Sequence, residues 1–215
     1  METNLLKGQK VVIRPKRMSD ASNDYLWRRD EELAKLDASQ LLRIPFSSFL
    51  LDYNDEIRHE SSRRRRFAID TLDGQHIGNC MFYNIDTRKK ETELGLMIGD
   101  RDYWDNGYGV DAVNTLVNYI FKTTTIDRIY LNTLEWNLRA QRCFRKCGFA
   151  PFKKQKRFSN TFVVMELLRS EWNQRNSQNV ESDCRKRGSG ESLLTGELGA
   201  PPSFKNPQRL GDTGG

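Results

Sequence analysis

A short stretch of the chain, Asp102–Gly109 (DYWDNGYG), has the composition of an anion-binding turn. It follows a strand-like run, Glu93–Ile98, and precedes Val110–Phe121, whose apolar residues recur at helical spacing. The start of a helix leaves backbone N–H groups unpaired and carries partial positive charge. Gly107 and Gly109 have no Cβ, so a phosphate can approach their backbone closely. We therefore expect a ligand with a phosphate or pyrophosphate here, and the rest of the chain must specify which one.

Composition divides the 215 residues into a domain and a tail. From about Asn176 the chain is dominated by Ser, Gly, Pro, Asn and Arg, a composition that buries little apolar surface. We expect a domain over residues 8–172 and a disordered tail over residues 173–215. Basic and acidic residues balance past Ser170, so the net charge of +6 belongs to the domain. A basic domain favours anionic ligands, acidic partners or nucleic acid.

The cysteines predict neither a disulfide framework nor a metal site. Four cysteines are too few to hold together a chain of this length. Cys143 and Cys147 share one face of a predicted helix, but both histidines lie far from them in sequence, so buried free thiols are expected. No signal peptide is visible, and no apolar run reaches the roughly 18 residues needed to cross a membrane. We expect a cytoplasmic protein that makes no membrane contact.

Hydrophobic periodicity predicts an α/β sheet with helices on its faces. Asp73-Gly74 is a strong hairpin signal inside a three-strand meander, and Gly148 is placed to stop a helix. The four arginines Arg63–Arg66 are expected to form the solvated start of a strand, with a contact to phosphate or an acidic substrate as the alternative. The expected strands are Lys10–Arg14, Phe67–Thr71, His76–Ile85, Thr92–Ile98, Arg128–Leu134, Phe152–Phe158 and Thr161–Leu168. The expected helices begin at Ser19 and cover Glu31–Leu36, Val110–Phe121 and Asn137–Cys147, with a loop and a short helix in Leu41–Asn54.

Two motifs in this element order resemble those of the GNAT superfamily of N-acetyltransferases. Its acetyl-CoA loop, Gln/Arg-x-x-Gly-x-Gly/Ala, aligns with Trp104–Gly109. Its second cofactor motif, Asn-x-x-Ala-x-x-x-Tyr/Phe-x-Lys-x-Gly-Phe, aligns with Asn137–Phe149. One branch of this superfamily acetylates the N-termini of ribosomal proteins. The first and last segments of the domain in that branch are resembled here by Val11–Pro15 and Glu166–Trp172. The resemblance spans residues 8–172 and implies a mixed, mostly antiparallel sheet of seven strands, flanked by helices, with a V-shaped split between strands 4 and 5.

The resemblance also implies how acetyl-CoA is bound. Pantetheine would insert into the split and bond to the backbone of the fourth strand, and the glycine-containing turn would wrap the pyrophosphate. Asn137 would hydrogen-bond near the pantetheine arm, and Phe144 would line the thioester end. The implied acetyl-CoA-binding residues are Leu96, Met97, Ile98, Trp104, Asp105, Asn106, Gly107, Tyr108, Gly109, Asn137 and Phe144.

The chain departs from the family pattern at two positions. Trp104 stands where Gln or Arg is common, which the turn can accommodate because its contacts are mainly made by the main chain. Phe144 stands where many members have a tyrosine that protonates the leaving thiolate, and a phenyl ring has no proton to give.

An attacking amine must also lose a proton. Glu93, on the strand that borders the split, is the candidate base, with Tyr83 and Asn84 as further cleft residues.

Several functions compete with an N-acetyltransferase. A Rossmann dinucleotide site is disfavoured because GxGxxG is absent from the first strand, and an RNA-binding module because no aromatic–basic motif is visible. A GNAT fold that binds acyl-CoA without catalysis remains open. For an enzyme, the expected acceptor is a protein N-terminal α-amine, with an amino-sugar nucleotide, polyamine or aminoglycoside as the alternative. The acceptor loops would be Ala34–Arg58 and Lys153–Asn160, and the final hairpin could pair with a second copy in a homodimer.

Overall fold

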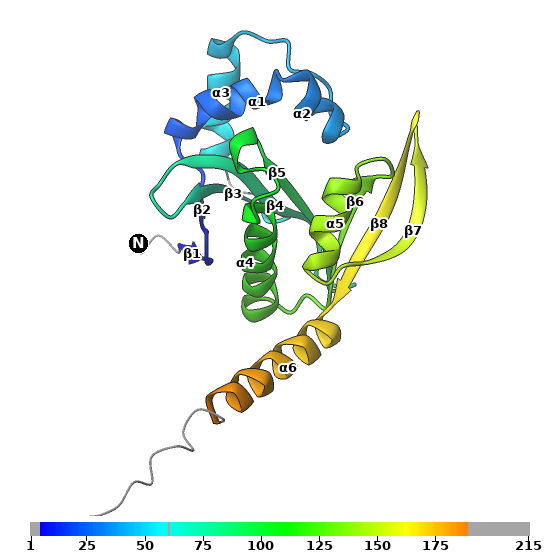
Figure 1. Cartoon of the computed structure of the whole chain (residues 1–215). Coiled ribbons are helices and arrows are strands. Elements are labelled where there is room, and N and C mark those ends of the chain that lie inside the picture. Colours follow the sequence, from blue (N-terminus) through cyan, green and yellow to red (C-terminus); the bar gives the residue numbers. More distant parts are fainter. Residues whose placement is uncertain (1–4, 60, 189–215) are drawn as a thin grey trace, which may run out of the picture. The chain divides into compact units, whose positions relative to one another are not determined.

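The computed structural model describes residues 5–59 and 61–188 (Figure 1). One sheet runs through the domain, with its strands in the order β1-β2-β3-β4-β5-β6-β8-β7. Every neighbouring pair is antiparallel except β5 and β6, which are parallel. The strands are β1 (Leu6–Lys7), β2 (Val11–Pro15), β3 (Arg64–Thr71), β4 (His76–Asp86), β5 (Glu91–Ile98), β6 (Arg128–Leu134), β7 (Ala150–Arg157) and β8 (Asn160–Leu168).

The helices follow the order that the sequence pattern predicts, with differences at their ends. They are the 3₁₀ turn η1 (Met18–Asp20), α1 (Ala21–Arg28), α2 (Glu31–Leu36), α3 (Phe46–Arg58), the 3₁₀ turn η2 (Arg101–Tyr103), α4 (Tyr108–Thr123), α5 (Leu138–Lys146) and α6 (Arg169–Gly188). The expected short helix in Leu41–Asn54 is the 13-residue α3, which buries Phe49 and Tyr53. Gly148 has a φ of +97° directly after α5, as expected of a residue that ends a helix.

The strand count corrects the expectation of seven strands, because the sheet has eight. The additional strand, β1, has two residues, too few for any hydrophobic period to reveal. The turn that joins it to β2 is held by a contact from a distant part of the chain. The Asp111 carboxylate in the first turn of α4 accepts hydrogen bonds from the backbone N–H groups of Gln9, Lys10 and Val11, at 3.1, 2.7 and 3.0 Å.

The predicted tail needs correction over part of its length. Residues 173–188, assigned to a disordered tail from composition, lie within helix α6. Trp172 near the start of that helix packs on Phe121, with ring centroids 5.4 Å apart, and its Nε1 donates to Asn118 at 2.8 Å. These contacts attach the start of α6 to the domain. The rest of the prediction, residues 189–215, lies outside the described residues. No helix in the described ranges is long and apolar enough to cross a membrane.

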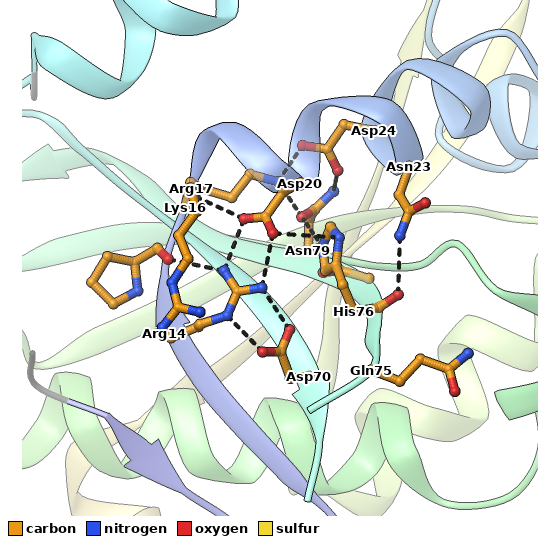
Figure 2. Close-up of polar contacts among 12 residues, drawn as sticks. Arg14, Lys16, Arg17, Asp20, Asn23, Asp24, Asp70, Gln75, His76 and Asn79 are labelled. Atoms are coloured by element: carbon orange, nitrogen blue, oxygen red, sulfur yellow. Dashed lines mark hydrogen bonds and ion pairs between the residues drawn. The ribbon is translucent and has the colours of Figure 1, made fainter. Parts of the chain in front are cut away.

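The two faces of the sheet differ in chemistry because side chains alternate along each strand. One face carries Ile13, Ile69 and Leu94 in the main apolar core, against Leu116 and Ile120 of α4. We call the opposite face the polar face. It meets α1 through a buried network of charged and polar side chains rather than through a large apolar core (Figure 2). Helix α3 joins this network through Tyr53.

Arg14 of β2 is the centre of that network. Its guanidinium forms paired hydrogen bonds with two carboxylates, at 2.8 Å to both oxygens of Asp20 and at 2.6 and 2.9 Å to those of Asp70. All three side chains are at most 10% exposed. Nearby, Lys16 bonds to Asp24, whose carboxylate also accepts a hydrogen bond from the Tyr53 hydroxyl of α3 at 2.8 Å. The network therefore holds η1, α1 and α3 on the polar face.

Replacing Arg14 with alanine should destabilise the domain strongly, because Asp20 and Asp70 would keep their burial and lose their cation. We expect the free energy of unfolding to fall by about 3–5 kcal/mol. Urea denaturation of Arg14→Ala beside Arg43→Ala measures this, since Arg43 is exposed and forms no ion pair with another described residue. Equal losses in the two variants would show that the network contributes little.

The same experiment has a predictable pH dependence. Burial acts to raise the pKa of Asp20, but the Arg14 guanidinium and the Arg17 backbone N–H hold it below its ordinary value. A depressed folded-state pKa stabilises the fold above the unfolded value of about 3.9 and stops doing so as the pH falls through the folded value. The difference between wild type and Arg14→Ala should therefore shrink below about pH 4.

Candidate active site

The sheet opens into a split between β5 and β6. Their parallel pairing consists of Glu91 with Arg128, Thr92 with Ile129 and Glu93 with Tyr130, and it extends no further along β5. The other edge of β5 stays paired with β4 as far as Ile98. The stretch Leu94–Ile98 therefore has one strand edge free to pair with the amide groups of a ligand. This is the V-shaped split expected between strands 4 and 5, and β1 shifts the numbering by one.

A cavity of about 290 Å³ lies at the split. Its wall brings together parts of the chain that are far apart in sequence: the end of β5, the turn before α4, one face of α5 and the end of α2. Nine of the predicted site residues line it, namely Leu96, Met97, Ile98, Trp104, Asp105, Gly107, Gly109, Asn137 and Phe144. Three others, Asn106, Tyr108 and Glu93, are outside the lining.

The turn before α4 has the backbone geometry that its glycines predict. Gly107 is the N-cap of the helix, with a φ of +85°, and Asp105 has a φ of +57°. The Asn106 side chain donates to the backbone oxygen of Asp102 at 3.1 Å, inside the turn. Lys10 donates to the carbonyl oxygen of Asn106 at 3.2 Å and lies 5.4 Å from the Tyr108 ring centre. Asn106 and Tyr108 thus support the turn with their side chains, and their N–H groups remain candidates for contact with an anion.

Trp104 closes the turn against β5. Its Nε1 donates to the carbonyl oxygen of Ile98 at 2.7 Å, and the Arg139 guanidinium lies 3.5 Å from the centre of its ring. The indole therefore bonds to one of the backbone groups expected to hold pantetheine. We infer that the remaining groups of Leu96, Met97 and Ile98 provide the strand-like contacts to a ligand.

Three basic residues of the site escaped the sequence analysis. Arg139, Arg142 and Lys146 follow one another at helical spacing on α5, and all three line the cavity. They add positive charge beside the N-terminus of α4, where the macrodipole already favours an anion. Their spacing within the second motif was a usable signal, but the motif pattern itself marks only Lys146.

Asn137 and Phe144 occupy the two ends of the α5 side of the cavity. The Asn137 side-chain oxygen caps the helix by accepting from the backbone N–H of Ala140 at 3.1 Å, so its amide N–H₂ is the group left to face a ligand. Phe144 is 7% exposed and packs on Phe149, with ring centroids 6.1 Å apart. It contributes apolar surface and no proton.

Glu93 sits at the closed end of the split, where the last β5–β6 pair forms. It is 7% exposed, and its carboxylate accepts hydrogen bonds from Asn84 Nδ2 at 3.0 Å and Asn132 Nδ2 at 2.6 Å. Burial, followed by the nearby Glu93 carboxylate, raises the pKa of Tyr83, which therefore stays protonated at neutral pH. The charge of Glu93 is thus surrounded by neutral groups. Asn132 Oδ1 is buried and has no hydrogen-bond partner among the described residues.

Asp37 is a second carboxylate that the sequence analysis did not single out. It follows α2 and lines the cavity together with Leu33 and Leu36 of that helix. Its residue surface is exposed, but the protein atoms around its carboxyl group desolvate it and raise its pKa. It lies inside Ala34–Arg58, one of the two segments expected to shape the acceptor side, although nothing in its sequence context distinguishes it from its neighbours.

A family model described as the acetyltransferase (GNAT) domain matches residues 10–150. The chain belongs to the GNAT acetyltransferase family. A relative from Bacillus licheniformis, named as the uncharacterized N-acetyltransferase p20, is 25% identical over 130 residues, which are 60% of this chain and 71% of that protein. The family match confirms the expected class of activity, an acetyl-CoA-dependent N-acetyltransferase.

Solved structures share the same fold at low sequence identity. Spermidine N-acetyltransferase from Vibrio cholerae, in complex with CoA and spermine, is 18% identical with a TM-score of 0.67, covering 75% of this chain and 97% of that one. An aminoglycoside acetyltransferase in complex with coenzyme A is 19% identical with a TM-score of 0.64, covering 76% and 98%. The residues of this cavity fit such a donor, since cations and helix-start amides suit its phosphates and a free strand edge suits its amides.

The two glycines of the turn should respond differently to alanine. A Cβ on Gly109 would contact Cys143 Sγ at 3.4 Å and Leu96 at 3.7 Å, ordinary distances, but it would enter the cavity. We expect Gly109→Ala to leave the melting temperature nearly unchanged and to weaken coenzyme A binding at least ten-fold.

Gly107→Ala is the matched control, because its φ of +85° strains any residue with a Cβ. It should cost about 1–2 kcal/mol of stability. Calorimetric titration with coenzyme A and thermal unfolding separate the two effects. Unchanged affinity in Gly109→Ala would place the donor elsewhere.

Proposed function

We propose that the chain transfers the acetyl group of acetyl-CoA to a primary amine that reaches Glu93 from the polar face of the sheet. The amine nitrogen attacks the thioester carbonyl carbon, the C–N bond forms, and the C–S bond breaks with its electron pair going to sulfur. The proton leaves the amine toward Glu93. Trp104–Gly109 and the basic face of α5 hold the donor, and the free edge of β5 aligns its pantetheine arm.

The observation that carries this proposal is the charge environment of Glu93. Glu93 is a buried carboxylate that is held by two neutral amides and forms no ion pair with another described residue, so it favours a ligand that brings a cation. A protonated amine meets that requirement and must give up its proton before it attacks. Because Glu93 lies outside the cavity lining, we propose that the proton passes through a water molecule, for which Asn132 Oδ1 is a suitable acceptor.

Phe144 occupies the position where many family members have a tyrosine that protonates the leaving thiolate. The thiolate would therefore take its proton from water or another residue, or leave unassisted, as its acidity allows. A reaction without a general acid is easier for an amine that loses its proton readily. Protein α-amines have a pKa near 8 and lysine-like amines a pKa near 10.4, a difference worth about 3 kcal/mol. We therefore propose a protein N-terminal α-amine as the acceptor.

The branch that acetylates ribosomal-protein N-termini is a weaker inference. Two of the residues that carry this resemblance have structural roles: Arg14 bonds to Asp20 and Asp70, and Trp172 packs on Phe121. Such contacts stabilise the domain and do not touch an acceptor. The choice of a protein N-terminus therefore rests on the chemistry around Glu93 and Phe144, and the ribosomal target stays a prediction.

A small polycationic amine is the second candidate. It is favoured by Asp37, which places a further carboxylate on the acceptor side of the cavity. The fold is also shared with an enzyme named for spermidine and with one named for aminoglycosides.

A homodimer through the final hairpin also stays a prediction. The edge strand β7 carries Lys153, Lys154, Lys156 and Arg157, and such charges discourage pairing with an identical edge.

The proposal is tested by thiol release from acetyl-CoA against N-terminal peptides, amino-sugar nucleotides, polyamines and aminoglycosides. We expect turnover of peptides, and a fall in kcat of about 10²–10⁴-fold in Glu93→Gln, with coenzyme A affinity unchanged. Glu31→Gln, an exposed carboxylate on α2, is the matched control and should behave like wild type.

The other outcomes separate the alternatives. Turnover of polyamines or aminoglycosides alone would establish the second candidate. Coenzyme A binding without turnover of any class would indicate a non-catalytic acyl-CoA-binding protein. A Glu93→Gln variant as active as wild type would remove Glu93 from the mechanism while leaving the enzyme class intact.

A further inference from the structure

The run Arg63–Arg66 lies beside the proposed acceptor site and is not used by the mechanism above. Its last three residues begin β3, and with the C-terminal half of α3 they line a cavity of about 200 Å³. We call this cavity the basic pocket. Its charged lining consists of the cations Lys16, Arg64, Arg65 and Arg66, the carboxylate Glu56, and His59.

Much of that positive charge is compensated locally. Lys16 is paired with Asp24, and Arg66 is paired with Glu56. Arg65 donates to backbone carbonyl oxygens of Ser61 and Arg64, which leaves its charge in place. Arg64 is exposed and forms no ion pair with another described residue. Because side chains alternate along β3, Arg65 belongs to the face opposite Arg64 and Arg66. The excess positive charge on the polar face therefore comes from Arg64.

Strand register places Arg64 in line with the proposed base. Arg64 of β3 pairs with Tyr83 of β4, Tyr83 pairs with Glu93 of β5, and Glu93 pairs with Tyr130 of β6. Directly paired residues point to the same face of a sheet, so Arg64 and Glu93 share the polar face. Two strand spacings separate their backbones, about 10 Å.

Tyr83 stands between them in the same row, and the next row of paired residues is Arg66, Met81 and Gly95. Met81 is 36% exposed and Tyr83 is half-buried. Both side chains lie over Gly95, where a Cβ would meet Met81 at 3.3 Å and Tyr83 at 3.5 Å. We call the surface formed by Met81, Tyr83 and Gly95 the floor; it separates the basic pocket from the closed end of the split, where the acetyl group would be delivered.

We propose that the acceptor is a peptide that lies across this floor, with its N-terminal amine at Glu93 and an acidic side chain in the basic pocket at Arg64. An extended chain advances about 3.3–3.6 Å per residue, so a 10 Å span places the acidic residue within the first four residues. The two ends of the floor have opposite charge, which matches an acceptor with an ammonium at one end and a carboxylate at the other. The distal ammonium of a polyamine would meet the arginines and be repelled. This inference rests on the proposed function, and it specifies which N-termini are preferred.

The test compares three N-terminal peptides that are identical except for residues three and four, which are Asp, Asn or Lys. For wild type we expect KM to be at least ten-fold lower for the Asp peptide than for the Lys peptide, with kcat within two-fold. In Arg64→Glu the order should reverse, with KM for the Asp peptide about ten-fold higher and KM for acetyl-CoA unchanged. Arg63→Glu is the matched control, because Arg63 is exposed and outside the pocket lining, and it should keep the wild-type order.

Failure of this inference differs visibly from failure of the proposed function. Equal KM values for the three peptides in wild type, or an Arg64→Glu variant with the wild-type order, would overturn the basic pocket as an acceptor subsite while the N-terminal acetyltransferase stands. No turnover of any peptide, with coenzyme A still bound, would refute the proposed acceptor and this inference with it. Arg64 is exposed, so its variants are expected to fold, and thermal unfolding checks this.

Discussion

The arrangement of the whole site depends on where the pairing of β5 with β6 ends. Had the two parallel strands continued to pair past Glu93, the backbone of Leu94–Ile98 would be satisfied within the sheet and the cavity would be filled. The early end of pairing costs the fold a few hydrogen bonds, which a ligand with amide groups can replace. The turn and helix start after β5 then lie beside the open edge, so strand-like pairing and anion binding meet at one place.

The polar face of the sheet serves two purposes at its two ends. Around Arg14, buried charges satisfy one another and hold η1 on β2 and β3 (Figure 2). The neighbouring contacts of Asp24 with Lys16 and Tyr53 hold α1 and α3. Past Arg66 the same face carries Met81, Tyr83 and Gly95 between Arg64 and Glu93, neither of which forms an ion pair with another described residue. Burial of paired charges gives rigidity, and unpaired charges of opposite sign at a fixed separation give a direction in which a substrate can lie.

The motif residues divide into those that shape the site and those that meet the ligand. Gly107 gives the turn its backbone conformation, and Trp104 ties that turn to β5 through the Ile98 carbonyl. Gly109 leaves space in the cavity. Phe144 has no proton to give, so the proposed reaction relies on another source of a proton for the leaving thiolate. The residues of one motif therefore differ in role: some set the backbone of the turn, and others leave space in the cavity.

The sequence by itself determined the family, the order of nearly all elements, the position of the split and most of the predicted site residues that line the cavity, because these follow from short-range periodicity and contiguous motifs. It missed β1, the extent of α6 and the role of Asp37, which depend on contacts or surroundings outside their own segments. It also could not assign a role to Arg63–Arg66, because a run of arginines has the same sequence pattern whether its side chains are solvated or bind a ligand. Strand register underlies the role proposed for Arg64, because only the folded sheet sets Arg64 on the same face as Glu93, two strands away.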